Sequence, residues 1–278
     1  MVSAVLLLPG TSLAQRGGRG AGPQGARPVP EPRFEYAGPT SDGRIAAAAA
    51  VTGQPGVYYA GAASGGVWKS TDGGLTWKPT FDNETSQAIG ALAVSPSNPS
   101  IVWAGTGEAW AVRDMDMMGD GIYKSTDAGE TWTNMGLVNT GRIGTIVVHP
   151  SNPDIALVCA LGRATGPQKE RGVFRTEDGG KTWQHVLFVN ENTGCSGLQM
   201  SQRDPNVVLA GTWEIELQTH YLYSGGNGSG IHISRDGGKT FTKITSPGLP
   251  RSPYGKTDVA IAPADGNRMY ALIQTGSA

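Results

Sequence analysis

Short apolar runs recur along the chain, and they come in pairs separated by a polar turn. Ala91–Val94 and Ile101–Ala104 form one pair, with the turn Ser95–Pro99 between them. Similar pairs are Ile146–Val148 with Ile155–Val158, Leu198–Ser201 with Val207–Ala210, and Val259–Pro263 with Met269–Leu272. Short runs rich in β-branched residues and bounded by proline, asparagine and glycine predict strands joined by turns. The chain is therefore predicted to be all-β.

A second motif alternates with these pairs. It reads Ser or Thr, any residue, Asp, any residue, Gly, any two residues and an aromatic residue, and we call it a box. Four boxes begin at Ser70, Ser125, Thr176 and Ser234 and end at Trp77, Trp132, Trp183 and Phe241. Their near-constant spacing of about 50 to 60 residues predicts one supersecondary unit that is repeated in space.

Each box is predicted to be a tight hairpin, because strand-like runs lie on both sides of it. Its carboxylate is expected to accept hydrogen bonds from backbone amides two residues on. The glycines permit positive φ, the threonine hydroxyl ties the returning strand to the turn, and the closing aromatic ring packs on a neighbouring sheet. We therefore predict structural and not catalytic roles for the box aspartates Asp72, Asp127, Asp178 and Asp236.

Each repeat contains four strands, which is the content of one β-propeller blade. The Pro/Asn turn joins the first two strands, and the box joins the last two. Because the chain alternates direction, both kinds of turn share one face, and the longer, individual loops share the other. Ligand binding is expected on this second face, which we call the loop-rich face.

From about residue 34 onward, the chain resembles known propeller families. The boxes resemble the Asp box of the bacterial neuraminidase repeat. Together with the Pro-Ser-Asn-Pro turns and Gly65–Ser70, they are similar to exported bacterial propellers related to sortilin and often labelled as glycosyl hydrolases. This resemblance implies a large multi-bladed propeller that binds ligands. Sortilin-type domains bind peptides and proteins, whereas sialidases and xyloglucanases hydrolyse glycans on similar blades.

The sequence departs from the patterns of glycan hydrolases at two places, and both departures argue against hydrolysis. Xyloglucanases carry a Tyr-Ala-Arg-Thr-Asp-x-Gly-Gly stretch with a catalytic Asp, and Ala63 stands at that position here. Sialidases open with Arg-Ile-Pro, and Arg44-Ile45-Ala46 lacks the proline. The resemblance thus implies an exported scaffold that binds a peptide, a protein or a glycan, without catalysis in this portion. The alternative is a glycoside hydrolase of the xyloglucanase or sialidase-like type.

Two glutamates are the candidate catalytic acids under that alternative. Glu108 and Glu214 follow equivalent strands two repeats apart, and Arg163 takes the same register between them. Glycosidases hold their two carboxyl groups about 5 Å or about 6.5–9.5 Å apart. Residues two blades apart are expected to be farther from each other, so both glutamates are predicted to cap strand ends.

The candidate binding residues are cations and aromatic side chains of the loop-rich face, namely Arg44, Trp110, Arg142, Arg163, Trp213 and Tyr221. Arg44 and Arg142 directly precede the first strand of a repeat, as Lys256 does. Cations in this position either ring the central channel and attract an anionic ligand, or pair with neighbouring carboxylates.

Composition narrows the range of partners. The net charge of −1 over 278 residues gives no electrostatic reason to expect binding to nucleic acid or to an anionic membrane. No segment after the N-terminus approaches about 20 uninterrupted apolar residues, so no transmembrane helix is predicted. Asp114, Asp116 and Asp120 lack the closing glutamate of a calcium loop. We predict neither a metal nor a cofactor.

The two ends of the chain differ from the repeats. Residues 1–14 are predicted to be a signal peptide for export to the periplasm or the exterior, and residues 15–33 a flexible linker rich in Gly, Arg and Pro. Residues 34–278 hold the blades. No box follows the last strand pair, so we expect the fifth repeat to be incomplete and the chain to be the N-terminal portion of a longer protein.

The chain has two cysteines, and either of two states is compatible with export. Cys159 lies in the second strand of one repeat, and Cys195 begins the first strand of the next. A disulfide suits an oxidising compartment. These positions do not obviously place the two Cα atoms within the ~7 Å that a disulfide needs. We expect two separate thiols.

Overall fold

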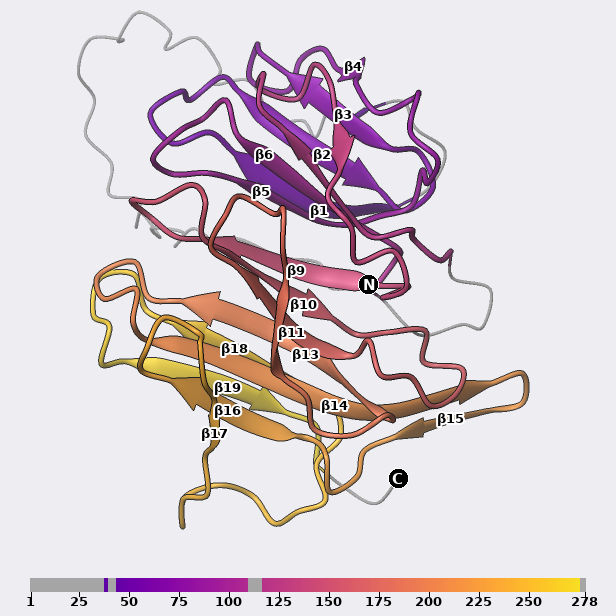
Figure 1. Ribbon diagram of the computed structural model, residues 1–278, viewed down its shortest axis with the longest axis vertical. Helices are drawn as coiled ribbons and strands as arrows, with labels where there is room; N and C mark the ends of the chain where they lie inside the picture. Colours follow the sequence, from indigo (N-terminus) through magenta and orange to yellow (C-terminus); the bar gives the residue numbers. More distant parts are fainter. Residues whose placement is uncertain (1–37, 40–43, 110–116, 276–278) are drawn as a thin grey trace, which may run out of the picture. The chain divides into compact units, whose positions relative to one another are not determined.

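The computed structural model describes residues 38–39, 44–109 and 117–275, all within the compact unit Ala37–Ala278. Every regular element in these residues is a β-strand. The strands form successive antiparallel sheets, which we call blades I to V (Figure 1). The predicted all-β propeller architecture is confirmed.

Blades I to III each contain four strands in chain order. Blade I consists of β1 (Ile45–Ala50), β2 (Tyr58–Ala62), β3 (Val67–Ser70) and β4 (Lys78–Pro79). Blade II consists of β5 (Ile89–Val94), β6 (Val102–Thr106), β7 (Ile122–Ser125) and β8 (Thr133–Asn134). Blade III consists of β9 (Ile143–Val148), β10 (Ala156–Ala160), β11 (Gly172–Thr176) and β12 (Gln184–Leu187).

Blade IV carries an additional strand that the sequence did not indicate. Its strands are β13 (Thr193–Met200), β14 (Val208–Gln218), β15 (Tyr221–Ser224), β16 (Gly230–Ser234) and β17 (Thr242–Lys243). The far end of β14 pairs with β15 and forms a hairpin that extends beyond the blade (Figure 1). In the part of blade V that the structure describes, β18 (Thr257–Ile261) pairs with β19 (Met269–Ile273).

The first strands of successive blades lie next to one another. β1 contacts β5, β5 contacts β9, β9 contacts β13, and β13 contacts β18. These five strands therefore form the inner edge of the stacked blades, as in a propeller. We call them the inner strands.

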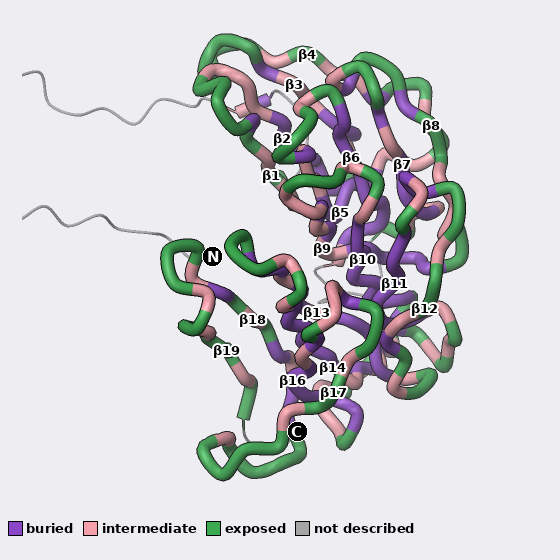
Figure 2. The backbone as a smooth tube through the Cα atoms, turned by 60° about the vertical axis from the view of Figure 1, so that its left-hand side comes forward, coloured by how far each residue is buried: buried purple, intermediate pink, exposed green. Residues whose placement is uncertain are grey.

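The hydrophobic core lies between the blades. Tyr59 and Val67 of blade I pack with Val102 and Tyr123 of blade II. Equivalent clusters join blade II to blade III and blade III to blade IV. The second strands of blades I to IV (β2, β6, β10 and β14) are largely buried, whereas β19 is mostly exposed (Figure 2). Each sheet thus covers its apolar faces with its neighbours.

The boxes form hydrogen-bonded hairpins with one shared geometry. In the second box, the Asp127 carboxylate accepts hydrogen bonds from the backbone amides of Glu130 and Thr131, at 3.0 and 2.9 Å, and from the Thr131 hydroxyl at 2.6 Å. The Ser125 hydroxyl donates to Asp127 and accepts from the Gly129 amide. We expected the carboxylate to accept from the amide two residues on, which is Gly129, and this was wrong. The Gly129 amide donates to the Ser125 hydroxyl instead, which occupies the inside of the turn.

These hydrogen bonds stabilise the ionised form of the box carboxylates. The bonds from Thr131 hold the pKa of Asp127 below its usual range. In the first box, the bonds from Thr76 lower the pKa of Asp72 to about 2.

Two further sets of contacts join the second, third and fourth boxes to a neighbouring blade. The Trp132 ring lies 5.2 Å from Phe81, and the Trp183 ring lies 6.1 Å from Trp103, both edge to face. The residue that precedes a box is a cation in the first three repeats, and it reaches the box of the next blade. The three contacts are Lys69 to Glu130, Lys124 to the Gly179 carbonyl and Arg175 to the Gly237 carbonyl, each at 2.9 Å.

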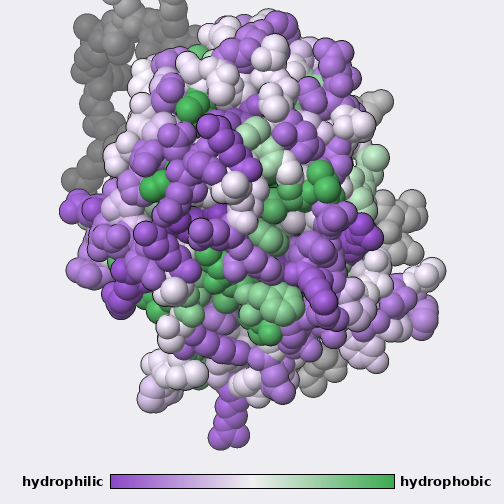
Figure 3. Space-filling view, viewed as in Figure 1, coloured by the Kyte–Doolittle hydropathy of each residue, from purple (hydrophilic) through white to green (hydrophobic). Residues whose placement is uncertain are grey.

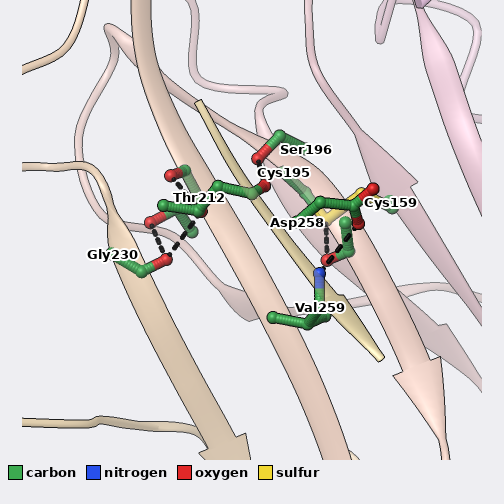
Figure 4. Close-up of a disulfide and its surroundings, with 9 residues drawn as sticks. Cys159, Cys195, Ser196, Thr212, Gly230, Asp258 and Val259 are labelled. Carbon is green, nitrogen blue, oxygen red and sulfur yellow. Dashed lines mark hydrogen bonds between the residues drawn. A yellow bond between two sulfur atoms is a disulfide. The ribbon is translucent and has the colours of Figure 1, made fainter. Parts of the chain in front are cut away.

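Cys159 and Cys195 form a disulfide, so the expectation of two separate thiols was wrong (Figure 4). The two Cα atoms are 5.1 Å apart. Cys159 belongs to β10 of blade III and Cys195 to β13 of blade IV, and these strands are in contact. The distance is short because adjacent blades stack face to face, which spacing along one chain does not reveal.

We predict that Asp127→Ala destabilises the protein by about 1–3 kcal/mol, because it leaves turn amides without their acceptor. Chemical denaturation measures the free energy of unfolding. Asp82→Ala is the matched control, since Asp82 is an exposed turn residue. Equal stability of Asp127→Ala and the wild type would show that the box carboxylate does not hold the hairpin.

A buried histidine predicts a pH dependence of stability. Burial lowers the pKa of His232 in β16 to about 4, and Lys243 adds to the effect. The unfolded chain therefore binds more protons between about pH 6.5 and pH 4, so stability is full above pH 6.5 and falls as the pH drops, by on the order of 3 kcal/mol. Unfolding free energies at pH 7 and pH 4.5 should differ less for His232→Gln than for the wild type. His220→Gln, at an exposed histidine, should retain the full difference.

Candidate functional site

The inner strands of blades I to IV all bulge at the same place. The register with the second strand slips by one residue at Ala46, Gly90, Gly144 and Ser196. At Gly90 a Cβ atom would lie 2.4 Å from the Ile143 carbonyl oxygen, so neighbouring blades approach too closely for a side chain. Bulges re-aim side chains and are common beside active sites. Among these four bulges, only Ser196 supplies a polar side chain.

A cavity of about 160 Å³ lies beside the Ser196 bulge, and we call it the channel pocket. Its walls come from three blades and the loop after β6. The lining residues that carry polar or aromatic side chains are Thr145, Ser196, Trp213, Lys256 and Asp258. The disulfide residue Cys195 also lines it. The pocket is therefore a product of blade stacking and not of one blade.

Hydrogen bonds fix the polar walls of the channel pocket. The Ser196 hydroxyl donates to the Thr257 carbonyl at 2.5 Å, which joins blade IV to blade V (Figure 4). The Thr257 hydroxyl in turn donates to the Thr212 carbonyl at 2.9 Å. One oxygen of Asp258 accepts from the amide of Val259 at 2.8 Å.

The channel pocket combines an indole ring with groups of both charges. Lys256 Nζ lies 5.3 Å from the centroid of the Trp213 ring, and Trp213 Nε1 donates to the Ser224 hydroxyl at 3.0 Å. Lys256 and Asp258 are two residues apart on an extended segment, so both side chains point to the same side. An indole, an ammonium, a carboxylate and hydroxyl groups suit a small neutral ligand with many hydroxyls.

The structure gives Glu108 and Glu214 different partners. Glu108 is buried and accepts a hydrogen bond from Arg44 Nε at 2.9 Å. Glu214 accepts from the Gly228 amide at 2.7 Å. Within the described part of the chain, no hydrogen bond or ion pair joins these two carboxylates to each other.

The cations before the inner strands have three different environments. Arg44 pairs with the carboxylate of Glu108. Arg142 is buried, and its guanidinium donates to the Arg163 carbonyl, while the rest of Arg163 is exposed. Lys256 lines the channel pocket. The sequence left open whether such cations pair with carboxylates or face the channel, and Arg44 is an example of pairing with a carboxylate.

A buried arginine that the sequence did not single out organises the loop-rich face. Arg171 donates from Nη1 to the carbonyls of Asn192 and Ile215, at 2.7 and 3.1 Å, and from Nη2 to that of Gly166 at 2.8 Å. Burial, with the nearby Arg142, lowers the pKa of Arg171 to about 10. One side chain thus ties the β10–β11 loop of blade III to the segment before β13 and to strand β14 of blade IV. Arg171 lies in a charged loop, where a solvated side chain is expected, so no sequence pattern indicates that it is buried.

The predicted aromatic residues are separated in the structure. Trp213 lines the channel pocket, whereas Tyr221 lies in the β14–β15 hairpin, where its hydroxyl donates to Glu216 at 3.2 Å. Its ring lies 4.6 Å from that of the exposed Tyr223. Trp110, like Asp114 and Asp116, lies outside the described residues.

Two classes of feature are absent from the described residues. They contain no group of three or more His, Cys, Asp or Glu side chains that would hold a metal ion. They also contain no helix with the length and apolar character needed to cross a membrane.

Comparison with protein families gives one match over more than half of the chain. Residues 120–271 match the Sortilin-Vps10 family model, whose description reads "Sortilin, neurotensin receptor 3".

The chain is also similar to curated xyloglucanases at low identity. It is 28% identical over 159 residues to a probable oligoxyloglucan-reducing end-specific xyloglucanase of Neosartorya fischeri, covering 55% of this chain and 18% of that protein. It is 26% identical over 242 residues to a xyloglucanase of Acetivibrio thermocellus, covering 74% of this chain and 26% of that protein. The chain thus spans a small part of the length of these relatives.

Solved structures of similar fold include GH74 enzymes. An ancestral GH74 enzyme aligns with a TM-score of 0.61 at 19% identity, covering 83% of this chain and 29% of that one. The GH74 xyloglucanase from Xanthomonas campestris aligns with a TM-score of 0.56 at 17% identity, covering 82% of this chain and 34% of that one. At these identities the likeness supports the propeller fold.

Proposed function

The chain belongs to the Sortilin-Vps10 family, and from this premise we propose that its blades bind a glycan in the channel pocket. The observation that carries the proposal is the pocket itself, where Trp213 lies beside Lys256, Asp258 and the Ser196 hydroxyl. A sugar ring has an apolar C–H face, which packs on an indole, and hydroxyls that both donate and accept hydrogen bonds. In the pocket, Trp213 can pack on the C–H face, and Lys256, Asp258 and Ser196 can bind the hydroxyls.

The names of the relatives favour a glycan over a peptide. The curated relatives are xyloglucanases, and the aligned structures include GH74 enzymes. We therefore propose a xyloglucan-type polysaccharide as the ligand class. A peptide or protein ligand, as the sortilin resemblance implies, is the competing outcome of the binding test.

We further propose that this portion of the protein does not carry out hydrolysis. Ala63 stands where the resemblance places a catalytic aspartate. Glu108 and Glu214 are each engaged by a separate partner, Arg44 and the Gly228 amide. These contacts support a structural role for both glutamates.

Glycoside hydrolysis is the second candidate function, and the xyloglucanase relatives favour it. In that case the acid is Glu108, Glu214 or a residue outside this chain. Release of reducing ends from xyloglucan by the purified protein, abolished by Glu108→Gln or Glu214→Gln, would establish hydrolysis by this portion. Absence of turnover together with binding would support the scaffold.

Export is part of the same proposal. Residues 1–14 have the pattern of a signal peptide, residues 15–33 that of a linker, and residues 34–278 form the binding portion. The Cys159–Cys195 disulfide supports an oxidising compartment such as the periplasm or the exterior.

We predict that Asp258→Asn and Lys256→Gln each weaken binding of a single-repeat xyloglucan oligosaccharide about tenfold, because a hydrogen bond to a charged group contributes about 1.5–3 kcal/mol. Isothermal titration calorimetry measures the affinity, and thermal melts establish that the variants fold. Asp82→Asn, at an exposed aspartate in the turn after blade I, is the matched control. Wild-type affinity in both pocket variants would exclude the channel pocket as the binding site.

A further inference from the structure

A second cleft, of about 490 Å³, lies beside β12, the outer strand of blade III. Its lining residues are Lys169, His185, Phe188, Val189, Asn190 and Glu191, and it shares none of them with the channel pocket. We call it the β12 cleft. Its volume is in the range of about 300–1,000 Å³ that is common for small-ligand sites.

Aromatic rings form an ordered part of the lining of the β12 cleft. The His185 ring stacks on Phe174 across the β11–β12 pair, with centroids 4.2 Å apart, and Phe188 lies 5.4 Å from His185. Phe188 is 46% exposed, and His185 is exposed as well, whereas Phe174 is buried. Apolar side chains also gather over the β10–β13 region of an otherwise largely hydrophilic face (Figure 3). Two exposed rings that contact each other, one of them stacked on the buried Phe174 ring, offer a preformed apolar surface.

The rim of the β12 cleft carries balanced charge and hydrogen-bonding groups of both kinds. Lys169 and Glu191 are exposed, and no ion pair in the described residues joins them. The ammonium only donates and the carboxylate only accepts, whereas a sugar hydroxyl does both. His185 Nε2 lies 2.8 Å from the Arg171 carbonyl and donates to it. A neutral, hydroxyl-rich ligand satisfies this set.

Hydrogen bonds order the walls of the β12 cleft. The Gln168 backbone amide donates to the Glu191 carbonyl at 2.9 Å, which links the loop of Lys169 to the loop of Glu191. Asn190 Oδ1 accepts from the Thr193 hydroxyl at 2.9 Å. The site therefore loses little conformational entropy when a ligand binds there.

We propose that the β12 cleft is a second saccharide-binding site for the polysaccharide that binds in the channel pocket. This inference rests on the proposed function. A polymer long enough to reach both sites gains avidity without any change in the channel pocket, whereas a short oligosaccharide binds at the channel pocket alone. Phe188 packs on a sugar ring, and Lys169 and Glu191 bind its hydroxyls.

The test compares two probes on one set of variants. The probes are xyloglucan polysaccharide and a single-repeat xyloglucan oligosaccharide, and the methods are affinity electrophoresis and calorimetry. Phe188→Ala should weaken polysaccharide binding about tenfold or more and leave oligosaccharide affinity unchanged. Phe188→Trp, which keeps an aromatic ring, and Val138→Ala, at an exposed apolar residue elsewhere, should bind both probes like the wild type.

The other outcomes separate this inference from the proposed function. Wild-type polysaccharide binding by Phe188→Ala would overturn the second site and leave the proposed function standing. Loss of both probes by a Phe188→Ala variant with an unchanged melting temperature would make the β12 cleft the primary site and overturn its secondary role. Failure of the wild type to bind either probe would overturn the proposed function and this inference together.

Discussion

The packing of one blade against the next is the interaction on which the rest of this structure depends. A four-stranded sheet has two faces, and the apolar side chains of blades I to IV are covered mainly by neighbouring blades. The box hairpins add to this packing, since Trp132 and Trp183 contact residues that lie outside their own hairpins. The cations before the boxes do the same from the other side, for Lys69, Lys124 and Arg175 each reach the following box. The repeat is thus stable as a stack and not as a single unit.

The channel pocket is a consequence of that stacking. Ser196 and Trp213 come from blade IV, Lys256 and Asp258 from blade V, and Thr145 from blade III. Covalent and hydrogen bonds hold these blades in register at the pocket. The Cys159–Cys195 disulfide joins blades III and IV, and the Ser196 hydroxyl joins blade IV to Thr257 of blade V. Any shift between blades therefore changes the spacing of the groups that we propose to bind a glycan.

The sequence predicted the features that recur from blade to blade. It missed the contacts that occur at a single junction between two blades. Four boxes at near-constant spacing indicated the blades, because turn chemistry and strand alternation are local properties. The disulfide, the hydrogen bond from Ser196 to Thr257 and the clamp made by Arg171 depend on contacts between blades, which no local pattern encodes. Lys256 was found through its position before an inner strand, whereas Asp258, two residues later, has no equivalent in the other repeats. Glu108 and Glu214 follow equivalent strands, so the sequence suggested them as a pair of catalytic acids. In the structure their carboxylates have separate partners.

The claim that blade stacking builds the binding site is tested most directly by the double variant Cys159→Ser, Cys195→Ser. Removing a native disulfide costs about 2–5 kcal/mol, so its melting temperature should fall. At a temperature where the variant remains folded, we predict that its affinity for the xyloglucan oligosaccharide also falls, because Ser196 follows Cys195 in β13 and loses its fixed place beside blade V. A lower melting temperature with wild-type affinity would contradict this, and would show that the pocket does not depend on the junction between blades III and IV.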